Sequence, residues 1–173
     1  RHGGWKTCLP DSTDCYYRLY TCHDMHQLLT AYQTMLHEYG SMKEYIRRNA
    51  TTGIEAIEAL CRFFSQHGAD KIIPKNTTSA CKRVCMFLRW MVRTGSPVDL
   101  GLWADIIDRR TLIMPLDTHV VQEAQRMNLL QSRTASMTTA RRLTDTMLKI
   151  FPDDPLKGDF ALFGLGVDEG NES

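Results

Sequence analysis

The chain has 173 residues, of which 43% are hydrophobic and 24% charged, and its formal net charge is +1. This length and composition suffice for one buried core, so we expect a single domain over residues 1–167. No apolar stretch is long enough to cross a membrane. We expect the acidic residues 168–173 to form a disordered tail, and the start at Arg1 suggests a piece of a longer protein.

The cysteines are even in number, but they are not expected to form a disulfide set. No apolar signal segment precedes them, which favours free thiols in a reducing cytoplasm. The first three are regularly spaced, but too widely for a zinc knuckle, and no closing Cys-x-x-Cys or His pair follows. We therefore expect no metal site among the six cysteines, which are Cys8, Cys15, Cys22, Cys61, Cys81 and Cys85.

The first half of the chain carries helical periodicity with recognisable start and stop signals. Asp24 is a suitable N-cap for a helix that ends at Gly40. Ser41 with Glu44, and Thr52 with Glu55, have the spacing of capping boxes, so two further helices are expected to start there.

The second half continues the helical pattern. The proline and polar residues at 74–78 predict a turn, followed by a helix from Ser79 to Arg93. Asp99 is a candidate cap for a short helix through Trp103 and Ile107, and Asp117 for one that follows it. Later helices are predicted over 136–150 and 155–164. Because no segment alternates for long with the period of a strand, the predicted fold class is all-α.

Positive charge is concentrated in one short segment. Between residues 71 and 93 there are six basic residues and no acidic one, namely Lys71, Lys75, Lys82, Arg83, Arg89 and Arg93. Lys82, Arg89 and Arg93 also share one face of the predicted helix, with the apolar residues on another. Such a stripe is usually a solvated charged face, and it becomes a candidate nucleic-acid surface only with further signals.

Two short motifs supply those signals. Ser79-Ala80-Cys81-Lys82-Arg83 follows the predicted turn, and Pro115-Leu116-Asp117-Thr118-His119-Val120 opens a later helix. This order resembles the helix-hairpin-helix DNA glycosylases, the group of endonuclease III and the 8-oxoguanine glycosylases. With the segments at 87–93, 99–103 and 159–166, the chain is more similar still to an uncharacterised bacterial branch of that superfamily. The likeness extends over about residues 16–167, and the N-terminal helical part of the family is missing.

The resemblance implies an all-α, helix-hairpin-helix glycosylase-like fold and a chemistry. Lys82 is the implied nucleophile that forms a Schiff base with the sugar, and Asp117 is the carboxylate that stabilises the developing sugar cation. The implied activity is that of a DNA glycosylase with AP-lyase activity in base-excision repair. Its partner is damaged double-stranded DNA, with 8-oxoguanine as the favoured lesion, and the target nucleotide is extruded from the duplex.

Further residues are assigned supporting roles. Candidate DNA contacts are Lys75, Arg83, Arg89, Arg93 and His119, while Trp90 and Trp103 are weaker candidates for stacking on an extruded base. Burial of the tryptophans, and a purely capping role for Asp117, are the alternatives.

Three departures from the family pattern qualify the resemblance. The turn at 74–78 has no glycine, which the backbone needs for close approach to a phosphate. The separation of Lys82 from Asp117 is wider than in endonuclease III and similar to that of the archaeal 8-oxoguanine enzymes. No cysteine follows Asp117, so an iron-sulfur cluster is not expected, and neither is any other cofactor. A non-catalytic DNA-binding module and an inactive fragment are the competing hypotheses.

Overall fold

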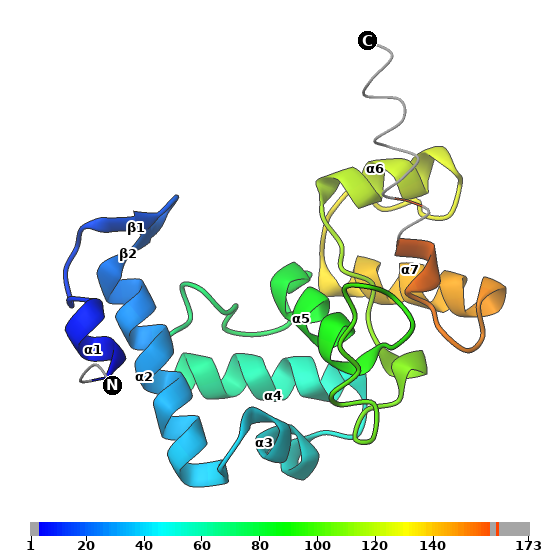
Figure 1. Cartoon of the computed structure of the whole chain (residues 1–173). Coiled ribbons are helices and arrows are strands. Elements are labelled where there is room, and N and C mark those ends of the chain that lie inside the picture. Colours follow the sequence, from blue (N-terminus) through cyan, green and yellow to red (C-terminus); the bar gives the residue numbers. More distant parts are fainter. Residues whose placement is uncertain (1–3, 160–161, 163–173) are drawn as a thin grey trace.

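The chain folds into a mostly helical structure, seen in a computed structural model that describes residues 4–159 and 162 (Figure 1). The helical class predicted from the sequence is therefore confirmed. In chain order the elements are α1 (Trp5–Cys8), β1 (Cys15–Tyr17), β2 (Tyr20–Thr21), α2 (Cys22–Tyr39), α3 (Met42–Asn49), α4 (Gly53–Gln66), α5 (Lys82–Val92), the 3-10 helix η1 (Arg109–Thr111), α6 (Thr118–Arg126) and α7 (Met137–Ile150).

A small β-hairpin precedes α2 and was not predicted. Strands β1 and β2 pair antiparallel, with Cys15 opposite Thr21 and Tyr17 opposite Tyr20. Arg18 lies in the turn with φ of 54°. Strands of three and two residues are too short to produce a readable alternation, so the sequence pattern could not reveal them.

The helix caps were largely predicted. The side chain of Thr52 accepts a hydrogen bond from the Glu55 N–H and the reciprocal bond is present, which confirms that capping box. Ser41 also caps its helix. The predicted N-cap of α2 was wrong: Thr21 is the cap, and Asp24 is the third helical residue, whose carboxylate accepts from the Thr21 N–H.

Two predicted helices differ in the structure. Helix α5 begins at Lys82 rather than Ser79, and an irregular connection over residues 67–81 joins it to α4. No helix forms over 100–107, where one was predicted after Asp99; residues 102–106 form turns, and the Asp99 carboxylate instead pairs with Arg93. For the helix predicted over 155–164, residues 155–156 form a turn and residues 157–159 and 162 are helical, whereas residues 160–161 and 163–164 and the predicted tail lie outside the described residues.

The apolar core runs along α4, which packs against α2, α3 and α5. In Figure 1, α5 lies between α2 on one side and α6 and α7 on the other. The segment 112–116, predicted only as a connection, is fully buried, and the Met114 N–H donates to Thr144 Oγ1 at 3.0 Å. This contact fixes the chain immediately before Asp117. Within the described part of the chain no helix is long and apolar enough to span a membrane.

Candidate active site

Lys82 and Asp117 meet where two helices begin. Lys82 is the first residue of α5, and its Nζ donates a hydrogen bond to Asp117 Oδ2 across 35 positions of sequence. Both side chains are partly accessible, with 48% of Lys82 and 34% of Asp117 exposed. The pair of residues singled out from the sequence is thus brought together on a surface that solvent and a ligand can reach.

Asp117 uses its two carboxylate oxygens for different partners. Oδ1 accepts from the Val120 N–H at 2.8 Å, so Asp117 is the N-cap of α6, as predicted. Oδ2 is left for Lys82. Partial burial raises the pKa of Asp117, but the hydrogen bonds from Lys82 and Val120 outweigh it and the net pKa is lowered. The carboxylate therefore stays ionised at neutral pH, and capping does not prevent it from facing a ligand.

A cavity of about 210 Å³ lies beside this pair. Its walls are mostly apolar, and it is lined by Lys82, Met86, Arg89, Pro115, Asp117, Val120 and Asp159. A hollow with apolar walls and a few converging polar groups is the usual form of a small-molecule or nucleobase site. A larger hollow of about 490 Å³ lies along residues 92–109, but no lysine lines it.

Asp159 adds a second carboxyl group to the cavity and was not assigned a role from the sequence. Its side chain is buried and pairs with Arg89. Burial raises the pKa of Asp159, and the positive charges of Arg89, Arg93 and Lys82 only partly oppose this. The sequence signal that could have revealed Asp159 is its position at the start of the segment 159–166, which is part of the resemblance to the glycosylases.

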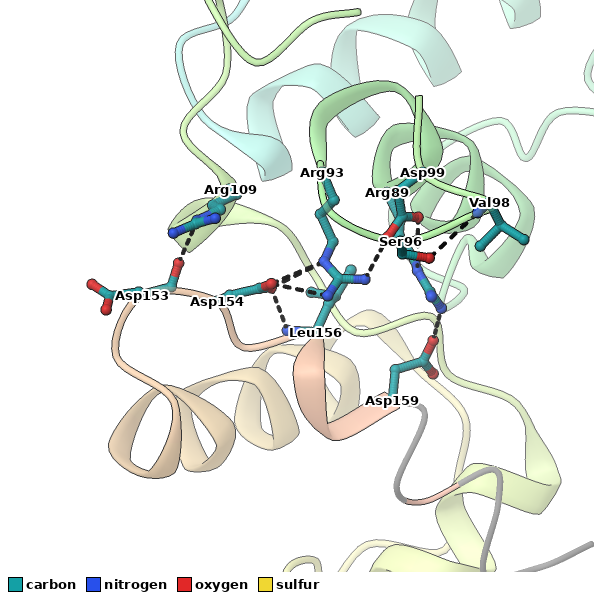
Figure 2. A network of polar contacts seen from close by, with 10 residues as sticks. All are labelled: Arg89, Arg93, Ser96, Val98, Asp99, Arg109, Asp153, Asp154, Leu156 and Asp159. Carbon is teal, nitrogen blue, oxygen red and sulfur yellow. Dashed lines mark hydrogen bonds and ion pairs between the residues drawn. The ribbon is translucent and has the colours of Figure 1, made fainter. Parts of the chain in front are cut away.

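Arg89 and Arg93 are buried rather than exposed, so the prediction that they contact phosphates on the surface is wrong. Both are buried, with 3% and 6% of the residue exposed. Arg93 binds Asp154 through Nε at 3.0 Å and Nη2 at 2.9 Å, and Asp99 through Nη1 at 2.9 Å (Figure 2). Helical periodicity placed these arginines on one face correctly, but that face is covered by the segments around Asp99 and Asp154.

Three of the predicted DNA contacts are accessible and belong to the segments that carry Lys82 and Asp117. Arg83 is exposed, donates to the Ile72 carbonyl at 2.9 Å, and has its guanidinium 5.2 Å from the centre of the Tyr20 ring. Lys75 is exposed in the connection 67–81, and His119 is half-buried in the first turn of α6. A hollow of about 300 Å³ that includes Lys71, Lys82 and Arg83 in its lining joins this region to the candidate site.

Trp103 and Trp90, the two candidates for stacking on an extruded base, differ in their exposure. Trp103 is only 4% exposed and packs edge-on against Phe87, with ring centres 5.3 Å apart. It belongs to the core, so its predicted contact with an extruded base is wrong. Trp90 is 40% exposed and lies two turns along α5 from Lys82.

The described residues offer no ready ligand set for a metal. No group of three or more His, Cys, Asp or Glu side chains is gathered there in a way that could hold an ion. All six cysteines are free thiols. The polar chemistry of the site is that of an amine, two carboxyl groups and a guanidinium.

Residues 4–168 match the family described as Protein of unknown function (DUF2400). No curated protein and no solved structure matches the chain significantly.

Proposed function

The chain belongs to the DUF2400 family of proteins of unknown function, and we propose that it is a DNA glycosylase with AP-lyase activity. The observation that carries this proposal is the contact between the Lys82 amine and the Asp117 carboxylate at the edge of a cavity. The predicted nucleophile and the predicted cation-stabilising group are thereby within reach of one reacting carbon. The proposed fold is that of the helix-hairpin-helix glycosylases, although the connection over residues 67–81 is longer than a tight hairpin.

The residue types suit a lysine-dependent glycosylase. Once the Lys82 ammonium has released one proton to water, its nitrogen forms a bond to the sugar C1′ as the bond from C1′ to the base breaks, and the base leaves with that electron pair. The proton that Lys82 gives up is taken by the departing base. Asp117, ionised and capping α6, stabilises the positive charge that develops on the sugar in this step. Opening of the sugar ring then gives the imine, and loss of a C2′ proton expels the 3′ phosphate.

The cavity beside the pair has the properties of a pocket for an extruded base. Its volume of about 210 Å³ is enough for a planar heterocycle, and Met86, Pro115 and Val120 give it apolar walls. Enzymes that act on a base in duplex DNA extrude it into such a pocket before reaction. An oxidised purine, specifically 8-oxoguanine, is the proposed lesion, because the spacing of Lys82 and Asp117 is similar to that of the archaeal 8-oxoguanine enzymes.

The proposed DNA-binding surface consists of Lys75, Arg83 and His119, next to the hollow that Lys71 also lines. These side chains are at least partly accessible, and Arg83 shares the hollow with Lys82, so they can contact phosphates. Arg89 and Arg93 have no part in it because they are buried among carboxylates. The proposed compartment is the reducing cytoplasm, which suits six free thiols.

Borohydride trapping on duplexes that each contain one damaged base tests the proposal. Wild-type protein is expected to give a covalent complex with the 8-oxoguanine duplex, and Lys82→Ala to give none while retaining binding to DNA. Lys149→Ala is the matched control, since Lys149 is exposed on α7 away from the pair, and it should trap as wild type does. DNA binding without trapping on any lesion would replace the enzyme by a non-catalytic DNA-binding module.

A further inference from the structure

Three thiols gather directly beneath the candidate site. Cys61 comes from α4, Cys81 is the N-cap of α5, and Cys85 lies one turn along α5. The Cys61 and Cys81 sulfur atoms are 3.9 Å apart, and both residues are buried. A disulfide requires a sulfur separation of about 2.05 Å, so these two sulfurs need to approach by less than about 2 Å to form the bond.

The three thiols have unequal chemistry. The hydrogen bond from Cys61 lowers the pKa of Cys81 to about 7 against the effect of burial, and the Ser79 hydroxyl assists. The same hydrogen bond, with burial, raises the pKa of Cys61. Burial raises the pKa of Cys85 to about 12, and its thiol donates to the Ala80 carbonyl at 3.5 Å. Cys81 is therefore the most nucleophilic of the three, with Cys61 in position as its partner.

Cys81 also has a route to a reagent from solution. It is one of the residues lining the hollow of about 300 Å³ that Lys82 and Arg83 share. Cys61 is not among the residues that line this hollow, although its sulfur is 3.9 Å from that of Cys81. A small oxidant that enters the hollow thus meets Cys81 first.

We propose that Cys61 and Cys81 are a redox-sensitive pair that forms a reversible disulfide when the protein meets hydrogen peroxide. The Cys81 thiolate attacks one peroxide oxygen, the O–O bond breaks, and a sulfenic acid and hydroxide result. The Cys61 sulfur then attacks the Cys81 sulfur, the S–O bond breaks, and the proton of Cys61 leaves with the hydroxide as water. Two thiols are oxidised and one peroxide is reduced to two molecules of water.

The expected consequence for the site follows from chain connectivity and rests on the proposed function. Cys81 precedes Lys82 and has the left-handed backbone conformation, with φ of 48° and ψ of 37°. Few residue types other than glycine adopt this conformation without strain, so the turn that starts α5 is sensitive to a shift at Cys81. Pulling Cys81 toward Cys61 draws the start of α5 toward α4 and separates Lys82 from Asp117. Oxidation is thus expected to break the contact between the Lys82 amine and the Asp117 carboxylate.

The test uses protein in which the three N-terminal cysteines, Cys8, Cys15 and Cys22, are replaced by serine. Hydrogen peroxide should remove two hydrogen atoms from the intact mass, and digestion without reductant should give one peptide that joins Cys61 to Cys81. Dithiothreitol should reverse both changes. Cys61→Ser and Cys81→Ser should abolish the linkage, whereas Cys85→Ser, a buried neighbour of the same size, should retain it.

The outcomes separate this inference from the proposed function. In protein whose circular dichroism is unchanged, a disulfide between other cysteines would refute the proposed Cys61–Cys81 pair. Sulfinic acid at Cys81 without a disulfide would refute it as well. If the link forms, borohydride trapping should be lost on oxidation, restored by dithiothreitol and insensitive to peroxide in Cys61→Ser. Trapping that persists in fully linked protein would refute the switch. Absence of trapping in the reduced protein as well would refute the glycosylase and leave the disulfide established.

Discussion

The replacement Arg93→Ala tests whether the buried arginines are structural. Arg93 has 7% of its side chain exposed, and its partners Asp154 and Asp99 have 5% and 0%. Three of its nitrogen–oxygen contacts are 3.0 Å or shorter. Removing one member of a buried ion pair costs about 3–5 kcal/mol, because the remaining charge has lost its compensation. At about 2–4 °C per kcal/mol for a domain of this size, the melting temperature should fall by about 6–20 °C.

Urea unfolding followed by circular dichroism measures this loss directly. Arg141→Ala is the matched control: Arg141 is exposed on α7, and its replacement should change the free energy of unfolding by less than about 0.5 kcal/mol. The double replacement Arg93→Met with Asp154→Leu removes the charges of Arg93 and Asp154 and should recover part of the loss, because Asp99 keeps a buried partner in Arg89. A loss of under about 1 kcal/mol for Arg93→Ala would refute the assignment and return Arg93 to the surface.

Three further predictions concern the site and its surroundings. Asp117→Asn keeps an N-cap for α6, so the melting temperature should move by less than about 2 °C, while base release in single-turnover assays slows about 100-fold or more; unfolding of this variant would mean that the carboxylate is only a cap. The double replacement Lys75→Ala with Arg83→Ala should weaken DNA binding and flatten its dependence on salt, measured by fluorescence anisotropy, and an unchanged salt slope would contradict the proposed surface. Hydrogen bonds from Lys71 and Thr21 lower the pKa of Asp24 to about 2, so Asp24 stabilises the fold above the unfolded-state pKa of about 4 and this stabilisation disappears as the pH falls toward 2. The stability difference between wild type and Asp24→Asn should therefore narrow over that interval, and an undiminished difference at pH 2 would contradict it.

Local signals were the most predictable part of this molecule. Ser41, Thr52 and Asp117 are helix caps in the structure as predicted from the sequence, because a cap depends on residues only three positions apart. The meeting of Lys82 and Asp117 came from the family resemblance, since no periodicity relates residues 35 positions apart.

Contacts distant in sequence account for the errors. Arg93 pairs with Asp154 over 61 positions. Helical periodicity therefore could not show whether the basic face of α5 is exposed or is covered by a distant segment. For the same reason the sequence did not show whether Trp103 is buried or exposed, and its packing against Phe87 places it in the core. The Cys61–Cys81 contact is equally invisible in the sequence, because it depends on how α4 and the start of α5 pack.

Locating the borohydride-trapped sugar on the protein identifies the nucleophile, which we propose is the Lys82 amine. The trapped complex with the 8-oxoguanine duplex is digested with nuclease and protease, and the modified peptide is sequenced by mass spectrometry. Lys71 and Lys75 lie close by on the connection before α5 and serve as internal alternatives. We expect the sugar fragment on Lys82, whereas a fragment on Lys71 or Lys75, or no modified lysine at all, would show that Lys82 is not the nucleophile.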